Sequence, residues 1–249
     1  MDRSEHNTFQ AEKRKERRKL KFKVFLFDLG GTLVNSREGV EKAIKFVIDE
    51  VCRRERREID YQEVIDFWWS IWNKIRPLGG KVIEKIYKMI AELRDFIGIK
   101  SISDKELIDL FYQAEIANTN PFPEVIDVLR KLKSLNFKLG IVSNCSIRWG
   151  TGIIKKCGLE GFFEVILISD REGISKPDPA IFQRALDLLN AESRETMMIG
   201  DDPKYDVPGA KSLGIYTCLV SRGKFLKFRS KKEVPDFIIH DLRGIFSII

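Results

Sequence analysis

The hydrophobic positions of the chain first form a continuous run at residues 22–27, FKVFLF, after a strongly polar N-terminal segment. A short run this apolar predicts a strand that is buried on both faces, as the strands of parallel sheets are. Asp28 ends the run, and Gly30 and Gly31 follow directly. Glycines at this point allow a tight turn and a close approach of a ligand to the backbone, so the end of this strand is a candidate binding position.

From residue 37 to about residue 119 the apolar positions recur every three or four residues. This spacing predicts a series of amphipathic helices. The breaker cluster PLGG at residues 77–80 separates two of them, and Ser103 has the spacing of an N-cap, with Glu106 completing a capping box. We expect the first helix to begin near residue 37 and the others to cover about residues 64–75, 81–96 and 104–117.

After Pro121 and Pro123 helix-like and strand-like segments alternate. Such alternation is typical of a doubly wound, Rossmann-like α/β core around a parallel sheet. The sequence therefore predicts an α/β core, residues 21–36 and 120–249, interrupted by an α-helical insertion at residues 37–119. Within this core we expect strands at 138–142, 163–168, 197–199, 216–220 and 236–239, and helices at 124–135, 147–157, 179–189 and 206–213.

Polar side chains with catalytic potential stand where the predicted strands end. In open parallel sheets, ligands bind outside the carboxyl ends of the strands. Strand ends that are far apart in the sequence can therefore contribute to one site at one edge of the sheet. The side chains that we expect to meet there are Asp28, Ser143, Asn144, Lys176, Asp201 and Asp206.

This set of residues is suited to phosphate chemistry. Three converging carboxylates without a counter-ion would repel one another, and their pKa values would rise. Carboxylates, carbonyls and water are the ligands that Mg²⁺ prefers, and a lysine and a serine hydroxyl can hold phosphate oxygens. Phosphoryl transfer depends mostly on positioning and charge stabilisation, and an aspartate can serve as its covalent nucleophile.

The run DLGGTL at residues 28–33, together with Ser143, Lys176 and residues 200–206, resembles the haloacid dehalogenase-like hydrolase superfamily. The resemblance covers about residues 22–247. It implies that Asp28 is a nucleophile that forms an aspartyl-phosphate, that Ser143 orients the phosphoryl group, and that Lys176 steadies both. The expected substrates are small phosphorylated metabolites.

The same resemblance implies a Mg²⁺ site formed by Asp28, the backbone carbonyl of Gly30, Asp201 and Asp206. Thr32 and Asn144 are candidate substrate contacts. The helical insertion resembles the cap of the superfamily, which closes over the site and selects the substrate.

Gly30 departs from the pattern, because phosphatases of the superfamily usually carry a second aspartate there as general acid and base. Loss of such a group typically lowers the rate by about 10² to 10⁴. Two alternatives to a phosphatase therefore stay open: a metal-independent 2-haloacid dehalogenase-type hydrolase, and a catalytically silent binding protein on the same fold. The acidic run at residues 200–206, GDDPKYD, favours phosphate chemistry, because dehalogenases lack its Gly-Asp start.

The net charge of +7 is concentrated in the N-terminal segment, because residues 1–23 contain nine Lys or Arg against four Asp or Glu. Residues 1–20 are too polar to build a core of their own, which predicts a flexible basic tail. Contact with nucleic acid through this tail is an alternative that the charge allows, but a solvated extension is favoured.

The remaining composition narrows the function further. The two histidines, His6 and His240, lie outside every motif, which argues against histidine as general base. The four cysteines form no C-x-x-C pair, so we expect free thiols in a reducing cytoplasm rather than a zinc or redox site. No apolar stretch approaches the roughly 18 to 20 residues of a membrane span, and no secretory signal is recognisable. We therefore expect a cytoplasmic enzyme.

Overall fold

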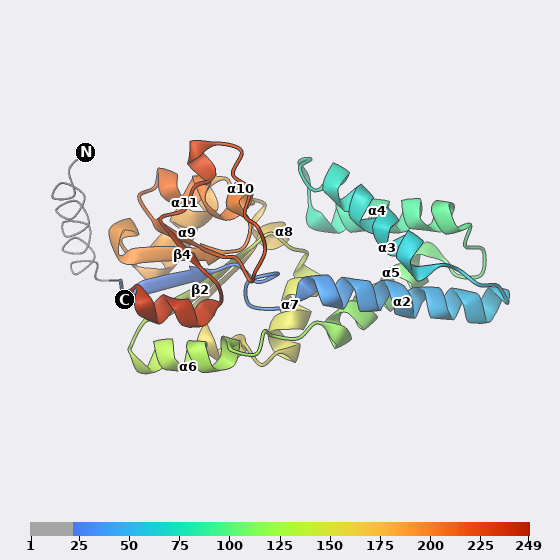
Figure 1. Ribbon diagram of the computed structural model, residues 1–249, viewed down its shortest axis with the longest axis horizontal. Coiled ribbons are helices and arrows are strands. Elements are labelled where there is room, and N and C mark those ends of the chain that lie inside the picture. The colour runs from blue at the N-terminus through green and yellow to red at the C-terminus, as the bar shows by residue number, and fades with distance from the viewer. Residues whose placement is uncertain (1–21) are drawn as a thin grey trace, which may run out of the picture.

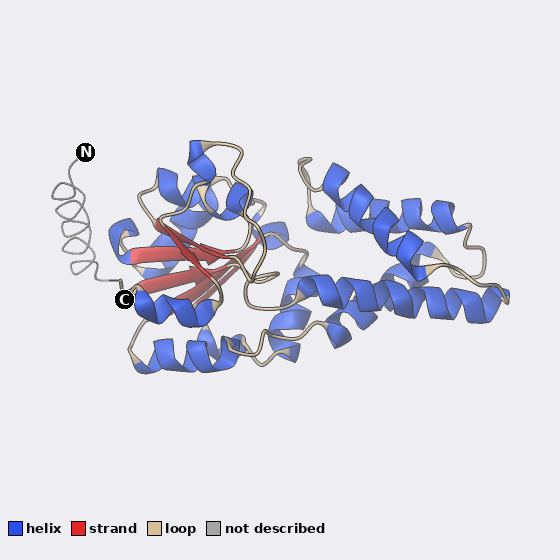
Figure 2. Cartoon of the chain, in the orientation of Figure 1, coloured by secondary structure: helices blue, strands red, loops and turns tan. Residues whose placement is uncertain are grey.

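The computed structural model describes residues 22–249, so the basic tail predicted over residues 1–20 lies outside the described residues. In the described part, six strands form one sheet in the order β3-β2-β1-β4-β5-β6, and all neighbouring pairs are parallel (Figure 2). The strands are β1 (Val24–Phe27), β2 (Lys138–Ser143), β3 (Val165–Ile168), β4 (Thr196–Gly200), β5 (Tyr216–Val220) and β6 (Phe237–Ile239).

Strand β1 lies between β2 and β4, and the order of the strands runs outward from it in both directions. This is the predicted doubly wound arrangement, and it creates a switch point at the end of β1. The connecting helices are α6 (Val125–Ser134), α7 (Ile147–Lys156), α8 (Ser169–Glu172), α9 (Pro179–Leu189), α10 (Pro203–Asp206) and α11 (Pro208–Ser212).

Alternate side chains of β1 serve two different hydrophobic clusters. Phe25 and Phe27 belong to the cluster that also contains the buried residues of α6 and α7, whereas Val24 and Leu26 belong to the cluster built from α9 and α11. A strand that is buried on both faces has no need of alternating polarity, which explains why residues 22–27 are almost uniformly apolar.

Four helices between β1 and α6 form a helical insertion that extends from one end of the sheet (Figure 1). Asn35 and Asn120 mark its two connections to the sheet, and they are joined by a hydrogen bond of 2.9 Å from the Asn35 N–H to the Asn120 carbonyl oxygen. No helix among the described residues is long and apolar enough to cross a membrane. The four helices are α2 (Ser36–Glu55), α3 (Tyr61–Ile75), α4 (Val82–Ile97) and α5 (Asp104–Asn118).

The observed elements follow the predicted pattern with local differences. Ser103 caps α5 as expected, because its hydroxyl accepts from the backbone N–H of Glu106. The helix predicted over residues 206–213 is present as the shorter α11, which begins at Pro208, and the separate helix α10 before it was not predicted. Proline lacks the N–H that a continuous helix would use and its ring clashes with the preceding turn, so the chain starts a new helix there.

Candidate active site

Three carboxylates meet at the switch point of the sheet. Asp28 follows β1, Asp201 follows β4, and Asp206 ends α10. One oxygen from each of the three lies within 4.8 Å of the other two. Asp28 and Asp206 are buried, whereas the side chain of Asp201 keeps 22% of its surface exposed. The strand ends therefore gather a compact acidic cluster, which opens toward the surface at Asp201.

Lys176 neutralises part of this cluster. Its Nζ lies 2.7 Å from Asp28 Oδ1 and 2.6 Å from Asp206 Oδ1, and only 3% of the residue is exposed. Burial works to lower the pKa of this ammonium, but the charges of Asp206 and Asp28 outweigh it and hold the pKa above its ordinary value. Lys176 is therefore a fixed positive charge beside the candidate nucleophile.

Asn144 positions that lysine. Its amide Nδ2 donates to the carbonyl oxygen of Lys176 at 2.8 Å, and its Oδ1 accepts from the Lys176 N–H at 2.9 Å. These paired bonds fasten the loop that carries Lys176 to the end of β2. Both hydrogen-bonding groups of the Asn144 side chain are used in this way.

One lysine does not balance three carboxylates. Burial, followed by the charges of Asp28 and Asp206, raises the pKa of Asp201 to about 7. Burial also raises the pKa of Asp206 to about 6, against the opposing effect of Lys176. Carboxylates in this situation gain from a further cation, and an all-oxygen donor set suits a hard divalent ion such as Mg²⁺. The residues present therefore fit a bound Mg²⁺.

Two glycines leave room for the acidic side chains. A Cβ at Gly31 would lie 2.3 Å from Asp201 Oδ2, and one at Gly200 would lie 2.1 Å from Asp206 Oδ2. Gly31 also has a φ of +82°, a conformation that glycine adopts without strain. Larger residues at these positions would displace the carboxylates, so the glycines of both motifs are steric requirements of the site.

The carboxylates open into a cavity of about 900 Å³ between the sheet and the helical insertion. Asp28, Ser143 and Lys176 line its floor, and Trp69 and Lys85 come from the insertion. Of the residues predicted from the sequence, the structure brings together at this cavity Asp28, Gly30, Ser143, Asn144, Lys176, Asp201 and Asp206.

Thr32 is the exception. The residue is fully buried, is not part of the cavity lining, and has a side-chain oxygen without a hydrogen-bond partner among the described residues. The expectation that Thr32 contacts substrate is therefore corrected. The tight turn after Asp28 directs the Thr32 side chain into the protein interior, and its carbonyl oxygen accepts from Arg222.

Sequence reasoning missed Arg222, which holds this turn. Its guanidinium donates to the carbonyl oxygens of Gly31 at 3.3 Å and Thr32 at 2.6 Å, and it pairs with Glu124 at 2.8 Å. Arg222 follows β5, so its place at a strand end was the only available signal. Sequence reasoning also missed Glu115 and Trp149, which line the cavity. The signal for Glu115 was a carboxylate on the buried stripe of α5, one turn after Phe111 and Tyr112.

Comparison with known proteins identifies relatives over most of the chain. A family model described as haloacid dehalogenase-like hydrolase matches residues 22–214. Glyceraldehyde 3-phosphate phosphatase of Methanocaldococcus jannaschii is 28% identical over 232 residues, which are 91% of this chain and 96% of the relative. Phosphoglycolate phosphatase of Aquifex aeolicus is also 28% identical, over 221 residues that cover 87% of this chain and 92% of the relative.

Solved structures share the fold. The crystal structure of a 2-haloacid dehalogenase from Pseudomonas syringae pv. Tomato DC3000 superimposes with a TM-score of 0.67 at 21% identity, over 91% of this chain and 97% of the dehalogenase. The fold alone therefore does not separate phosphatases from dehalogenases. That distinction depends on the chemistry of the site.

Proposed function

The chain belongs to the haloacid dehalogenase-like hydrolases, and from this premise we propose that it is a Mg²⁺-dependent phosphatase of small phosphorylated metabolites. The observation that carries the proposal is the cluster of Asp28, Asp201 and Asp206, bridged in part by Lys176. The sequence relatives named above are phosphatases of small metabolites, which supports the same activity.

In this proposal Asp28 attacks the phosphorus atom and carries the phosphoryl group as an aspartyl-phosphate. Lys176, whose Nζ lies 2.7 Å from Asp28 Oδ1, holds the nucleophile in place and offers positive charge to the phosphate oxygens. The hydroxyl of Ser143, which lines the same floor, would donate to another phosphate oxygen.

Asp28, Asp201, Asp206 and the backbone carbonyl of Gly30 would hold the Mg²⁺. When bound, the ion would supply positive charge against the carboxylates and the phosphate. Asp206 already uses both oxygens, one for Lys176 and one for the Asp202 N–H at 2.9 Å. A supporting role for Asp206, through water, therefore fits better than direct ligation.

The helical insertion would act as a cap. Its residues form the part of the cavity wall that faces the carboxylates, including Trp69, Arg76 and Lys85. Arg76 Nη2 also pairs with Asp202 Oδ2 of the core at 2.7 Å. Closure around substrate would exclude water from the first step, and the cap residues would select the leaving group.

The acidic cluster also favours phosphate chemistry over dehalogenation. A dehalogenase needs only one carboxylate nucleophile and gains nothing from two further buried carboxylates. Here Asp206 is buried and Asp201 is half-buried, at an electrostatic cost that a cation would relieve.

A substrate panel tests the proposal. Glyceraldehyde 3-phosphate, phosphoglycolate, acetyl phosphate and 2-chloropropionate are incubated with the full chain in Mg²⁺ or in EDTA, and released phosphate and chloride are measured. We expect phosphate release that requires Mg²⁺ and is lost in Asp28→Asn. Asp127→Asn, an exposed aspartate of α6, is the matched control and should retain activity. Chloride release in EDTA would instead favour the dehalogenase, and no release at all would favour a silent binding protein.

A further inference from the structure

Two buried polar groups in the cavity wall take no part in the chemistry described so far. Glu115 of α5 is 6% exposed, and Trp149 of α7 is 8% exposed. The indole N–H of Trp149 has no hydrogen-bond partner among the described residues. It faces Glu115 closely enough to lower the pKa of that carboxyl group, yet without hydrogen-bond geometry. Glu115 and Trp149 thus form a buried polar pair in the cavity wall.

Such a pair is costly unless a ligand completes it. A buried polar group without a partner costs about 1–3 kcal/mol, and buried polar groups in native proteins are nearly always hydrogen-bonded. An apolar pair at the same positions would pack without that cost. Both residues line the cavity that contains Asp28, so the group that satisfies them can come from a bound substrate.

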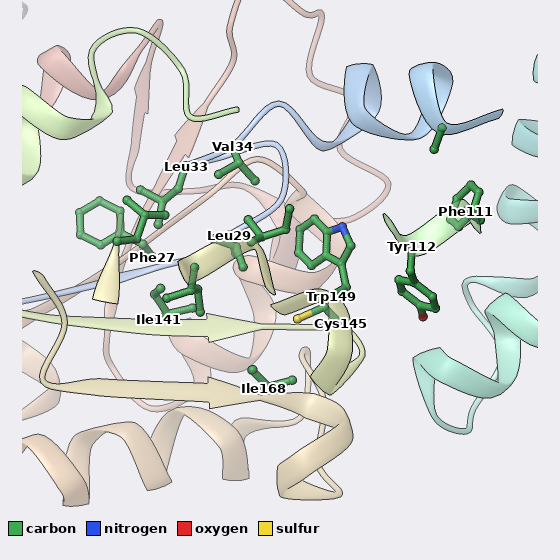
Figure 3. Close-up of a cluster of buried hydrophobic side chains, with 14 of the residues drawn as sticks. Phe27, Leu29, Leu33, Val34, Phe111, Tyr112, Ile141, Cys145, Trp149 and Ile168 are labelled. Carbon is green, nitrogen blue, oxygen red and sulfur yellow. The ribbon is translucent and has the colours of Figure 1, made fainter. Parts of the chain in front are cut away.

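Trp149 adjoins the position of the missing acid. A Cβ placed on Gly30 would lie 3.4 Å from Cη2 of Trp149, so the indole ring flanks the space that a side chain at residue 30 would enter. Figure 3 shows Trp149 between Leu29, next to Gly30, and Tyr112 of α5. The indole nitrogen is the part of the ring that faces Glu115, which lies one turn after Tyr112.

From this geometry we infer that Glu115 is the general acid and base that residue 30 does not provide, with the Trp149 N–H binding the leaving group beside it. The inference rests on the proposed phosphatase function. It also sets a substrate class: phosphate monoesters of alcohols, whose leaving oxygen needs a proton.

The protonation of Glu115 agrees with this role. Burial, only partly offset by the Trp149 indole, raises its pKa to about 8. The carboxyl group therefore carries its proton at neutral pH, as a general acid must.

The reaction proceeds in two steps. Asp28 Oδ bonds to phosphorus while the ester P–O bond breaks, and Glu115 gives its proton to the leaving oxygen, which departs as an alcohol. The ionised Glu115 then takes a proton from a water molecule whose oxygen bonds to phosphorus. The P–O bond to Asp28 breaks, inorganic phosphate leaves, and Asp28 and protonated Glu115 are restored.

Leaving-group dependence separates this role from a structural one. We compare Glu115→Gln with the wild type on two alkyl phosphates, glyceraldehyde 3-phosphate and phosphoglycolate, and on acetyl phosphate, whose leaving group needs no proton. Loss of the acid should lower kcat on the alkyl phosphates by about 10² to 10⁴, with only a few-fold change on acetyl phosphate. Glu106→Gln, at a half-buried position of the same helix outside the cavity lining, is the control and should leave both rates unchanged.

A rescue variant completes the test. The three atoms nearest to a Cβ placed on Gly30 belong to Ser36 and Trp149, at 3.2 to 3.5 Å, so Gly30→Asp fits with a small adjustment of Ser36. In the Glu115→Gln background, Gly30→Asp should raise kcat on the two alkyl phosphates at least tenfold, since a general acid typically contributes about 10² to 10⁴.

The failures are distinguishable. A wild type that hydrolyses no phosphate removes the proposed function itself. A wild type that hydrolyses only acetyl phosphate, or a Glu115→Gln variant whose rates on all three phosphates are unchanged or fall equally, overturns the role of Glu115 and leaves the phosphatase standing.

Discussion

Asp170 of the core caps a helix of the insertion through the backbone of Val82: Asp170 Oδ1 accepts from the Val82 N–H at 2.7 Å. Its second oxygen accepts from the Ile83 N–H at 2.9 Å. Val82 is the first residue of α4, and Lys81, at the N-cap position, contributes no side-chain hydrogen bond. A carboxylate at a helix N-terminus also interacts favourably with the helix dipole. This contact ties the insertion to the sheet beside the cavity.

Removal of this contact should weaken the attachment of the helical insertion to the core. We expect Asp170→Ala to lower the free energy of unfolding by about 1 kcal/mol, as loss of an N-cap does, and to raise KM because the cavity wall is held less firmly. Asp60→Ala is the matched control: Asp60 caps α3 within the insertion, so it should cost similar stability and leave KM unchanged. Denaturant unfolding and steady-state kinetics measure the two effects, and an equal KM in both variants would contradict the role of Asp170 in closure.

Mg²⁺ should stabilise the folded protein, because the proposed Mg²⁺ site is assembled only in the folded state. Saturation at a hundredfold excess over Kd adds about 2.7 kcal/mol by mass action. We expect Tm to rise when Mg²⁺ replaces EDTA at constant ionic strength, and this rise to disappear in Asp201→Asn. Differential scanning calorimetry measures the shift. The same rise in Asp201→Asn would place the ion elsewhere.

Arg222 should be required for the turn that follows the nucleophile. The Arg222–Glu124 pair is largely buried, with 12% and 8% of the two side chains exposed, and removal of one partner of a buried pair costs about 3–5 kcal/mol. We expect Arg222→Ala to destabilise the protein by roughly this amount. Arg222→Lys keeps the charge but cannot bridge the carbonyls of Gly31 and Thr32 together with Glu124, so it should lower kcat more than it lowers stability. Chemical denaturation and kcat are the measurements, and a full kcat in Arg222→Lys would argue against positioning.

Glu115 should make stability depend on pH. Its pKa is raised from 4.5 to about 8 in the folded state, so between these values the folded protein binds a proton that the unfolded chain does not. Stability therefore falls as pH rises through this window, by about 1.4 kcal/mol per pH unit for one group. Glu115→Gln does not titrate, so its stability should fall less steeply over the same range. The free energy of unfolding of both proteins is measured by denaturant unfolding from pH 5 to pH 8. If it changes with pH equally in the two proteins, Glu115 is not buried as a neutral acid.

The sequence by itself determined the elements and the fold class. Residues 24–27 form a strand because a uniformly apolar run can be buried on both faces. The alternation after Pro121 predicts a parallel sheet. Because parallel strands share one carboxyl edge, the positions of Asp28, Asp201 and Lys176 in one site also followed from the order of motifs. The start of α11 at Pro208 rather than at residue 206 was missed, although a proline favours the first position of a helix.

Only the tertiary structure decided which side chains meet. Lys176 contacts Asp28 across 148 positions of sequence, and Arg222 contacts Thr32 across 190. Local periodicity states which face of an element is buried, but not which distant group it is buried against. For the same reason the sequence did not show that the Thr32 side chain lies in the interior rather than in the cavity. Glu115 stands on the buried stripe of α5, but the sequence did not show which group it is buried against. Its burial depends on how α5 packs against α7, since packing of the two helices removes water from the carboxyl group and leaves it facing the cavity.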